Sequence, residues 1–154
     1  MYVDESGMND NEFYPYAYSA TGKRYYEAHP GHHSKRISMI GALCNRSFMS
    51  PFMFEGYCTT EVFEVYVEKV LLPNLKSNMV VIIDNASFHR SLKAKNLIEG
   101  VGARLMYLPP YSPDLNPIEN YWYKIKTAVK KMMRKSKILL LNAMKSVLKK
   151  LSIC

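Results

Sequence analysis

The chain has 154 residues, of which 48% are hydrophobic and 22% are charged, and its formal net charge is +8. This length and composition predict a single globular domain and exclude a disordered or collagen-like chain. The longest apolar runs fall far short of the roughly 18 residues that a membrane-spanning helix needs, and the N-terminus lacks a signal-peptide pattern. We therefore expect a cytoplasmic protein with no membrane partner.

The basic residues are concentrated near the C-terminus. Residues 120–154 contain ten Lys or Arg and no acid, whereas residues 1–119 contain eleven basic and thirteen acidic residues. Such a segment favours a polyanionic partner such as DNA, because each neutralised phosphate releases counterions. A solvated, lysine-rich helix face is the alternative interpretation. The three cysteines are odd in number and lack zinc-site spacing, so we interpret them as free thiols in a reducing compartment.

The first part of the chain predicts mainly strands. Residues 2–5 form a short candidate strand, and residues 10–33, with their Tyr, Pro and Gly, predict a loop or irregular hairpin. The apolar runs 36–44 and 48–55 are joined by Asn45-Arg46-Ser47, which predicts an antiparallel pair.

A helix and a strand are predicted next. Thr59 or Thr60 is a suitable cap for a helix that ends near Pro73. Met79 to Ile83 is a continuous apolar run, typical of a central strand buried on both faces. The predicted inward stripe of the helix is Val62, Val65, Tyr66, Lys69 and Leu72.

The second half of the chain alternates helix and strand. Residues 91–99 predict a helix closed by Gly100, and residues 103–108 predict another apolar strand. Asn116 has the position of a helix cap, followed by Pro117 at the first helical position. The apolar stripe of this helix is Ile118, Trp122, Ile125, Val129 and Met132 or Met133.

A last amphipathic helix is predicted over about 137–151. Its apolar side consists of Leu140, Leu141, Met144, Val147, Leu148 and Leu151. Antiparallel strands followed by alternating helix and strand define an α/β fold, with a mixed sheet and helices on both faces.

Three acids from distant parts of the chain are predicted near one edge of this sheet. Asp4 lies at the end of the first predicted strand, Asp84 follows the central strand, and Glu119 opens the helix after a Pro-rich loop. Chemistry in open α/β sheets collects at the carboxyl ends of the strands. Carboxylates suit Mg²⁺ or Mn²⁺, and two such ions serve in-line displacement at phosphorus.

Each acid also has a structural interpretation. Asp84 is placed to cap a turn, Asp4 to be an exposed strand terminus, and Glu119 to complete a capping box with the helix start. Glu5 and Asp114 are rival acids. Strand alternation predicts that Glu5 faces away from Asp4, and Asp114 lies in a Pro-bounded turn where Asp is common.

Two longer motifs resemble a known family. The string VVIIDNASFH (80–89) and the string LPPYSPDLNPIENYW (108–122) are similar to the catalytic domain of DDE transposases, in the mariner-like branch that includes many bacterial insertion sequences. Asp4-Glu5-Ser6-Gly7 resembles that family's first-strand motif. Thirty-four residues separate Asp84 from Glu119, a spacing typical of the branch.

The resemblance implies a ribonuclease H-like fold with a mixed five-stranded sheet over residues 1–135. A basic amphipathic helix, 136–154, packs on it or extends it. Asp4, Asp84 and Glu119 become the ligands of two Mg²⁺ or Mn²⁺ ions. The implied activity is that of a transposase: water cleaves a DNA phosphodiester at the transposon end, and the freed 3′-hydroxyl attacks target DNA.

Four further residues have candidate roles. The resemblance implies that Asn85 and His89 support the second acid, although His89 is equally suited to pack a helix start. Lys126 and Lys130 share a helical stripe with Glu119, and we hypothesise that they bind DNA phosphate. A metal site at the loop histidines His29, His32 and His33 is less favoured, because their spacing is irregular and no Cys or acid completes it.

Family members carry helix-turn-helix modules before the catalytic domain, whereas this sequence starts inside the predicted first strand. We therefore expect end recognition to come from an upstream reading frame or another DNA-binding partner, and homo-oligomerisation is plausible because two ends must be joined. The alternative function is a catalytically inactive remnant, or a regulator that binds DNA. The expected location is the bacterial nucleoid.

Overall fold

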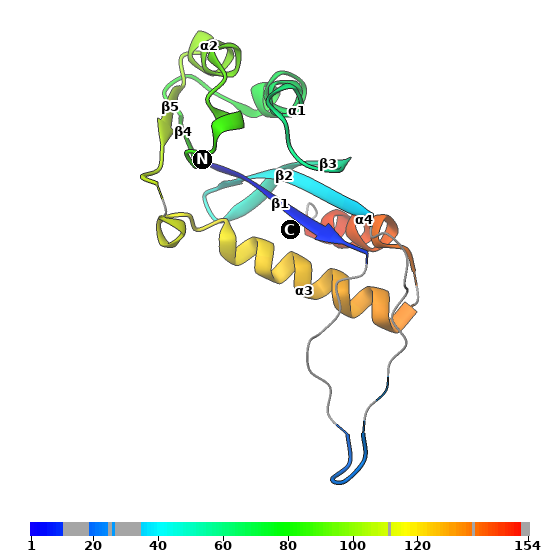
Figure 1. Cartoon of the computed structure of the whole chain (residues 1–154). Coiled ribbons are helices and arrows are strands. Elements are labelled where there is room, and N and C mark those ends of the chain that lie inside the picture. The colour runs from blue at the N-terminus through cyan, green and yellow to red at the C-terminus, as the bar shows by residue number, and fades with distance from the viewer. Residues whose placement is uncertain (11–18, 25, 27–34, 111, 137, 152–154) are drawn as a thin grey trace.

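The computed structural model describes residues 1–10, 19–24, 26, 35–110, 112–136 and 138–151. Its centre is one five-stranded sheet in the order β3-β2-β1-β4-β5 (Figure 1). The pairs β1–β2 and β2–β3 are antiparallel, and the pairs β1–β4 and β4–β5 are parallel, which confirms the predicted mixed sheet. The strands are β1 (Tyr2–Asn9), β2 (Arg36–Cys44), β3 (Ser47–Glu55), β4 (Val80–Ile83) and β5 (Arg104–Tyr107).

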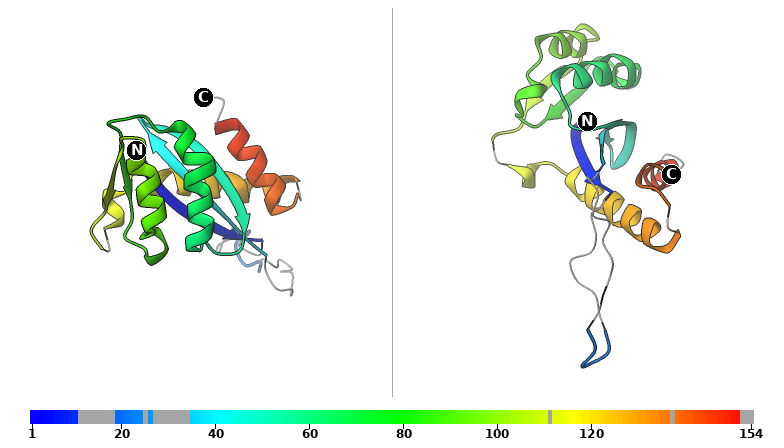
Figure 2. Two further views of the ribbon diagram at one scale, coloured as in Figure 1. Left: turned by 90° about the horizontal axis from the view of Figure 1, so that it is seen from above. Right: turned by 45° about the vertical axis from the view of Figure 1, so that its right-hand side comes forward.

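Helices cover both faces of the sheet, as predicted (Figure 2). Two long helices pack on one face of β1–β3, and the remaining α-helices pack on the other face. No helix in the described ranges is long and apolar enough to span a membrane. The helices are α1 (Thr60–Tyr66), η1 (Val67–Leu71), η2 (Leu72–Asn74), η3 (Ser87–His89), α2 (Leu92–Gly100), η4 (Pro113–Leu115), α3 (Glu119–Ser136) and α4 (Leu140–Leu151).

Strand β1 is longer than predicted and ends at Asn9. Its second half contains Ser6 and Gly7, whose types have little strand preference, but every residue of β1 pairs with β2. Alternation along β1 places Val3 in the core beneath α1 and α2, and Met8 in the core beneath α3 and α4. The segment that carries Asp4 is therefore held by a full antiparallel ladder.

The expectation that the central strand is buried on both faces is wrong for β4. Val81 and Ile83 are buried against α1 and α2, but Val80 and Ile82 are only half-buried. The strand residues in the core beneath α3 and α4 belong to β1, β2 and β3. The face of β4 on the side of α3 and α4 is therefore incompletely covered. Next to β4, β5 is the edge strand, and Met106 is 53% exposed.

The prediction of which side chains of the first helix face the core is wrong. Val65 is 46% exposed, whereas the buried residues are Phe63, Tyr66, Val67 and Leu71. After Tyr66 the helix widens into the π-helical turn η1, which changes the periodicity that places side chains on one face. The predicted cap is present, since the Thr59 hydroxyl accepts a hydrogen bond from the Val62 N–H at 3.4 Å.

Gly100 does not close α2 as predicted, because it is the last residue within the helix. The left-handed residue is Gly102, with φ +80, and its N–H bonds to the Glu99 carbonyl at 2.9 Å. A left-handed residue after a helix end satisfies carbonyl groups that have no partner inside the helix.

Gly41 lies opposite Asp4 in the β1–β2 ladder, and we expect its replacement by alanine to destabilise the fold. A Cβ at this position would lie 2.5 Å from Cζ of Phe48 and 3.1 Å from Cη2 of Trp122, both of which belong to buried rings. Overpacking of this kind costs about 1–3 kcal/mol, measurable by urea unfolding. The matched control is Gly100→Ala, where a Cβ meets no atom within 4 Å. A Gly41→Ala variant as stable as that control would contradict the prediction.

Candidate active site

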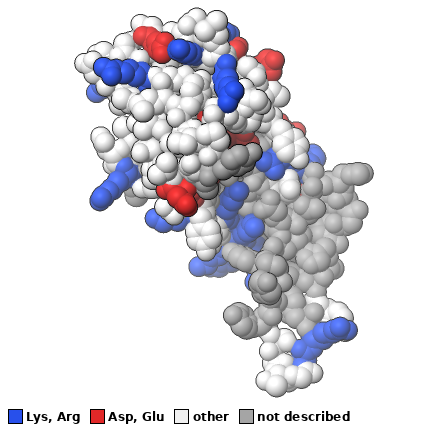
Figure 3. All heavy atoms as spheres, turned by 60° about the vertical axis from the view of Figure 1, so that its left-hand side comes forward, with Lys and Arg blue, Asp and Glu red and all other residues white. Residues whose placement is uncertain are grey.

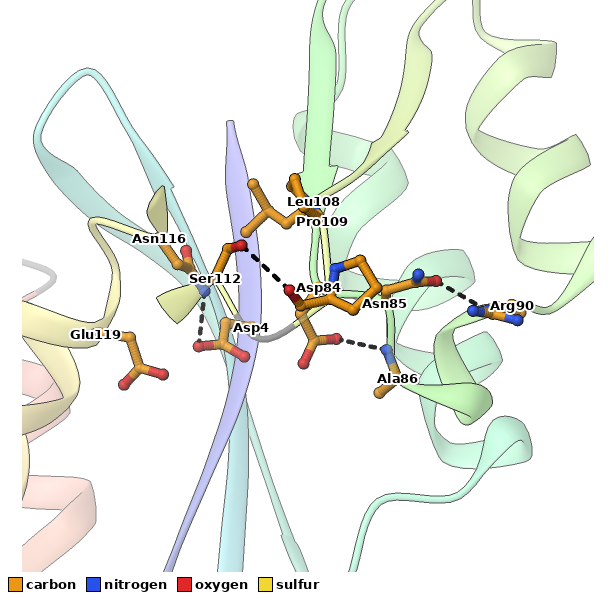
Figure 4. Close-up of a pocket in the computed structure, with 11 residues that line it drawn as sticks. Asp4, Asp84, Asn85, Ala86, Arg90, Leu108, Pro109, Ser112, Asn116 and Glu119 are labelled. Atoms are coloured by element: carbon orange, nitrogen blue, oxygen red, sulfur yellow. Dashed lines mark hydrogen bonds between the residues drawn. The ribbon is translucent and has the colours of Figure 1, made fainter. Parts of the chain in front are cut away.

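The three predicted acids line one pocket. Strand pairing aligns Val3 with Ile83, so Asp4 and Asp84 each follow the last paired residue of two adjacent parallel strands. Adjacent strands lie about 5 Å apart, which brings these two acids close together. Glu119, the first residue of α3, lies beside them in a cavity of about 430 Å³ (Figure 4). The three acids thus converge on one pocket as predicted, but Asp4 lies within β1 and not at the carboxyl end of its strand, because β1 continues to Asn9.

Asp4 is only 6% exposed and is held by three N–H donors. Its Oδ1 accepts a bond from the Glu5 backbone N–H at 2.8 Å. Its Oδ2 accepts bonds from Nδ2 of Asn116 and Nε1 of Trp122, each at 3.1 Å. Asp4 is thus a buried group with a fixed orientation, and not the exposed strand terminus of the alternative interpretation.

The pKa of Asp4 is raised to about 7, chiefly because burial disfavours its charged form. The negative charges of Glu119 and Asp84 raise this pKa further, whereas the bonds from Glu5 and Trp122 oppose the shift. The hydrogen bonds to Asp4 therefore do not offset the burial and the negative charges in the pocket. A bound cation would stabilise this arrangement.

Asp84 is paired with His89. Nδ1 of the buried His89 ring lies 2.5 Å from Asp84 Oδ1, and the Ala86 N–H donates to the same oxygen at 3.2 Å. Burial raises the pKa of Asp84, but the hydrogen bond and charge of His89 outweigh it, and the net shift is downward. The His89 ring packs against Phe63 and Phe88 with centroids at 4.6 and 4.3 Å. His89 thus both packs and contacts the acid.

Glu119 is exposed, and the capping-box interpretation of this acid does not hold. Asn116 was predicted to cap the helix, but its side-chain amide donates to Asp4, and its Oδ1 is buried without a partner among the described residues. Helix α3 accordingly begins at Glu119 and not at Asn116. Figure 4 shows the Glu119 carboxylate on the same side of the pocket as Asp4.

The rival acids lie elsewhere. Glu5 faces away from Asp4, as predicted, and one of its oxygens lies 4.0 Å from Nη2 of Arg36. Asp114 is exposed and does not line the acid pocket, but it lines a neighbouring cavity together with Asn116 and Glu119.

The other predicted site residues do not all lie at the acid pocket. Asn85 lines the pocket, whereas Lys126 and Lys130 are half-buried along α3 and do not line it. The loop histidines His29, His32 and His33 lie outside the described residues.

Sequence reasoning missed three residues of the site. Asn116 was interpreted only as a cap and Trp122 only as core, yet both bond to Asp4. Arg90, which was given no role, lines the pocket and donates from Nε to Asn85 Oδ1 at 2.9 Å. A usable signal existed for Trp122, because a buried indole N–H usually finds an acceptor.

The donor set suits a hard divalent cation. Mg²⁺ commonly binds through one or two carboxylates, with water and substrate phosphate as its other ligands. Asp4, Asp84 and Glu119 supply carboxylates to one cavity with a surplus of negative charge. Across the described ranges, no three His, Cys, Asp or Glu side chains lie close enough together to hold a metal ion by themselves. An ion held partly by substrate oxygens fits this open arrangement.

Strand order 3-2-1-4-5, with helices on both faces and three acids beside the β1–β4 pair, defines a ribonuclease H-like domain. The same fold occurs in the Mos1 strand transfer complex (TM-score 0.67, 14% identity, 98% of this chain and 52% of that chain). It also occurs in the catalytic core domain of BIV integrase (TM-score 0.56, 11% identity, 96% and 80%). The predicted fold class is thereby confirmed.

The chain belongs to the DDE superfamily of endonucleases, whose family model matches residues 1–139. It is 33% identical over 85 residues to the uncharacterized protein y4pE/y4sA of Sinorhizobium fredii (strain NBRC 101917 / NGR234), covering 54% of this chain and 61% of that protein. It is 31% identical over 80 residues to the transposable element Tc1 transposase of Caenorhabditis elegans, covering 52% and 28%. The matched regions thus cover less than two thirds of both relatives.

Proposed function

We propose that this chain is the catalytic unit of a metal-dependent DNA transposase of the bacterial insertion-sequence branch, acting at the nucleoid. It would cleave phosphodiesters at transposon ends and transfer the freed 3′-hydroxyl to target DNA. The observation that carries the proposal is the convergence of Asp4, Asp84 and Glu119, from three distant segments, on one pocket. Membership of the DDE endonuclease superfamily supports the same chemistry.

In this proposal Asp4, Asp84 and Glu119 hold two Mg²⁺ or Mn²⁺ ions. When bound, such ions lower the pKa of an attacking hydroxyl or water and stabilise the leaving oxygen. Asp4 contributes a carboxylate fixed by three donors, and Asp84 one oriented by His89. Glu119, on a helix start, supplies the exposed third carboxylate.

Asn85 and His89 have supporting roles in the proposal. His89 orients Asp84 through Nδ1, and its ring is fixed between two phenylalanines. Asn85 lines the pocket directly after Asp84, and its Oδ1 accepts a hydrogen bond from Arg90 Nε. Positioning by such residues contributes strongly to phosphoryl transfer, because the reaction depends on alignment and on charge stabilisation.

Lys126 and Lys130 are proposed to contact DNA phosphates along α3. They follow Glu119 at helical spacings, and the face in Figure 3 carries basic side chains on both sides of its acidic groups. We expect the double Lys→Ala variant to bind DNA more weakly, with a log–log salt slope shallower by about 2. The control changes two exposed lysines outside the basic segment, Lys76 and Lys95. Equal salt slopes for the two variants would refute the contact.

End recognition is proposed to need a DNA-binding partner or upstream frame, and pairing of two ends to need a homo-oligomer. The division of the chain at residue 135 also remains a prediction. Helix α4 shares one hydrophobic core with α3 and the sheet, which favours a helix packed on the catalytic unit over one that extends from it.

The experiment is a nicking assay on supercoiled plasmid DNA with the 154-residue chain. We expect Mn²⁺ to convert plasmid to the open-circular form and EDTA to prevent this. A wild-type chain that binds DNA but does not nick it with Mn²⁺ would refute the catalytic proposal. That result would instead favour the alternative of an inactive remnant or DNA-binding regulator, which the basic segment 120–154 also suits.

A further inference from the structure

Arg90 is the one cationic side chain among the described residues that line the acid pocket. It follows η3, whose turn is closed by the bond from the Arg90 N–H to the Ser87 carbonyl at 3.2 Å. Figure 4 shows Arg90 and Glu119 at opposite sides of the Asp4–Asp84 pair. The pocket thus has a carboxylate at one side and a guanidinium at the other.

The orientation of Arg90 is set by Asn85. Nε of Arg90 donates to Asn85 Oδ1 at 2.9 Å, which uses the inner nitrogen of the guanidinium and leaves the two terminal nitrogens for other acceptors. Because Asn85 directly follows Asp84, this bond fixes Arg90 relative to the second acid.

Arg90 does not neutralise the acids. In the described part of the chain it forms no ion pair within 4.0 Å of a carboxylate, and the partner of Asp84 is His89. A guanidinium that lines an acidic pocket, is fixed through Nε and pairs with no acid is suited to an anion that enters from outside. Planar guanidinium groups bind phosphate through two parallel N–H bonds, which fixes both distance and orientation.

We propose that Arg90 binds a phosphate of the DNA strand next to the phosphodiester that is cleaved. This inference rests on the proposed function, since it takes DNA as the ligand of the pocket. The strand would cross the pocket from α3 toward η3, with the reacting phosphate over the acids and its neighbour on Arg90. Asn85 then acts as a positioning residue through Arg90, in addition to its place in the pocket lining.

The test measures DNA binding separately from cleavage. The wild type, Arg90→Ala and Arg90→Lys are titrated against a short fluorescent duplex with Ca²⁺ over a range of KCl concentrations. We expect Arg90→Ala to weaken binding about tenfold and to reduce the salt slope by about 1. Arg90→Lys keeps the charge but loses the planar guanidinium that makes two parallel N–H bonds, so the DNA affinity of this variant should be intermediate. The matched control is Arg104→Ala, an exposed arginine at the opposite end of β5 from the pocket.

The outcomes separate the two proposals. An Arg90→Ala variant with the wild-type affinity and salt slope would overturn this inference, even if Mn²⁺-dependent nicking by the wild type supports the proposed function. A wild type that never nicks, but whose DNA binding depends on Arg90, would overturn the proposed function and support the phosphate contact. A lower melting temperature with an unchanged salt slope would show that Arg90 is only structural, which also overturns the inference.

Discussion

Replacement of Asp84 by asparagine is expected to reduce Mn²⁺-dependent plasmid nicking by about a thousandfold or more. The change keeps the shape of the side chain and an oxygen that can accept from the Ala86 N–H, but it removes one of the charges that would hold a cation. Loss of this charge should also lower the pKa of Asp4, because Asp84 is one of the groups that raise it.

The control for this variant is Glu55→Gln, which removes the same charge from an exposed carboxylate at the end of β3, outside the acid pocket. Both variants should melt within a few degrees of the wild type. Equal nicking by Asp84→Asn and the wild type would show that the observed nuclease activity does not arise in this pocket.

Trp122→Ala is expected to lower the free energy of unfolding by about 3–5 kcal/mol. The ring is 2% exposed and packs edge-on against Phe48 at 5.3 Å between centroids, so truncation leaves a large cavity in the core beneath α3. It also removes a donor from the buried carboxylate of Asp4. Urea unfolding followed by circular dichroism measures the loss.

Trp122→Phe separates the hydrogen bond from the packing. The phenyl ring keeps most of the apolar volume but lacks the N–H that lowers the pKa of Asp4, so this pKa should rise above about 7. Asp4 must lose its proton to bind a cation, and metal affinity therefore falls as the pH drops below this pKa. We expect Mn²⁺ affinity, measured by calorimetry at several pH values, to decline at a higher pH in the variant than in the wild type.

Tyr123→Phe is the control, because Tyr123 is the next residue of α3 and is 73% exposed. Its pH profile should match that of the wild type. Identical profiles for Trp122→Phe and Tyr123→Phe would mean that the indole bond does not influence the charge of Asp4.

The sheet and the positions of the acids were predictable because their signals are local. Apolar runs bounded by turns defined the strands, and the long strings around Asp84 and Glu119 suggested the family and hence the mixed five-stranded sheet. The errors arose where the chain departs from regular helical periodicity, or where tertiary contacts determine which side chains are buried. The π-helical turn η1 changes which residues of the first helix are buried. The core beneath α3 and α4 does not extend to β4, so one face of that strand is incompletely covered.

The contacts inside the site were less predictable, because they depend on the approach of remote segments or on an irregular turn. Asn116 has the sequence position of a helix cap, and only the approach of β1 redirects its amide to Asp4, 112 residues away. Arg90 reaches Asn85 because η3 folds the intervening residues into a turn. The sequence could therefore name the acids and His89 beside Asp84, but not Asn116 and Trp122, which bond to Asp4.

The single oxygen Oδ2 of Asp4 accepts from Asn116 and Trp122, which lie 112 and 118 residues later in the chain. During translation, therefore, the first two acids emerge from the ribosome well before the residues that fix the first of them. A nascent polypeptide that ends before Asn116 lacks both side-chain donors to Asp4, and it lacks Glu119 as well. The complete pocket therefore forms only once the segment 116–122 has been synthesised and has folded onto β1.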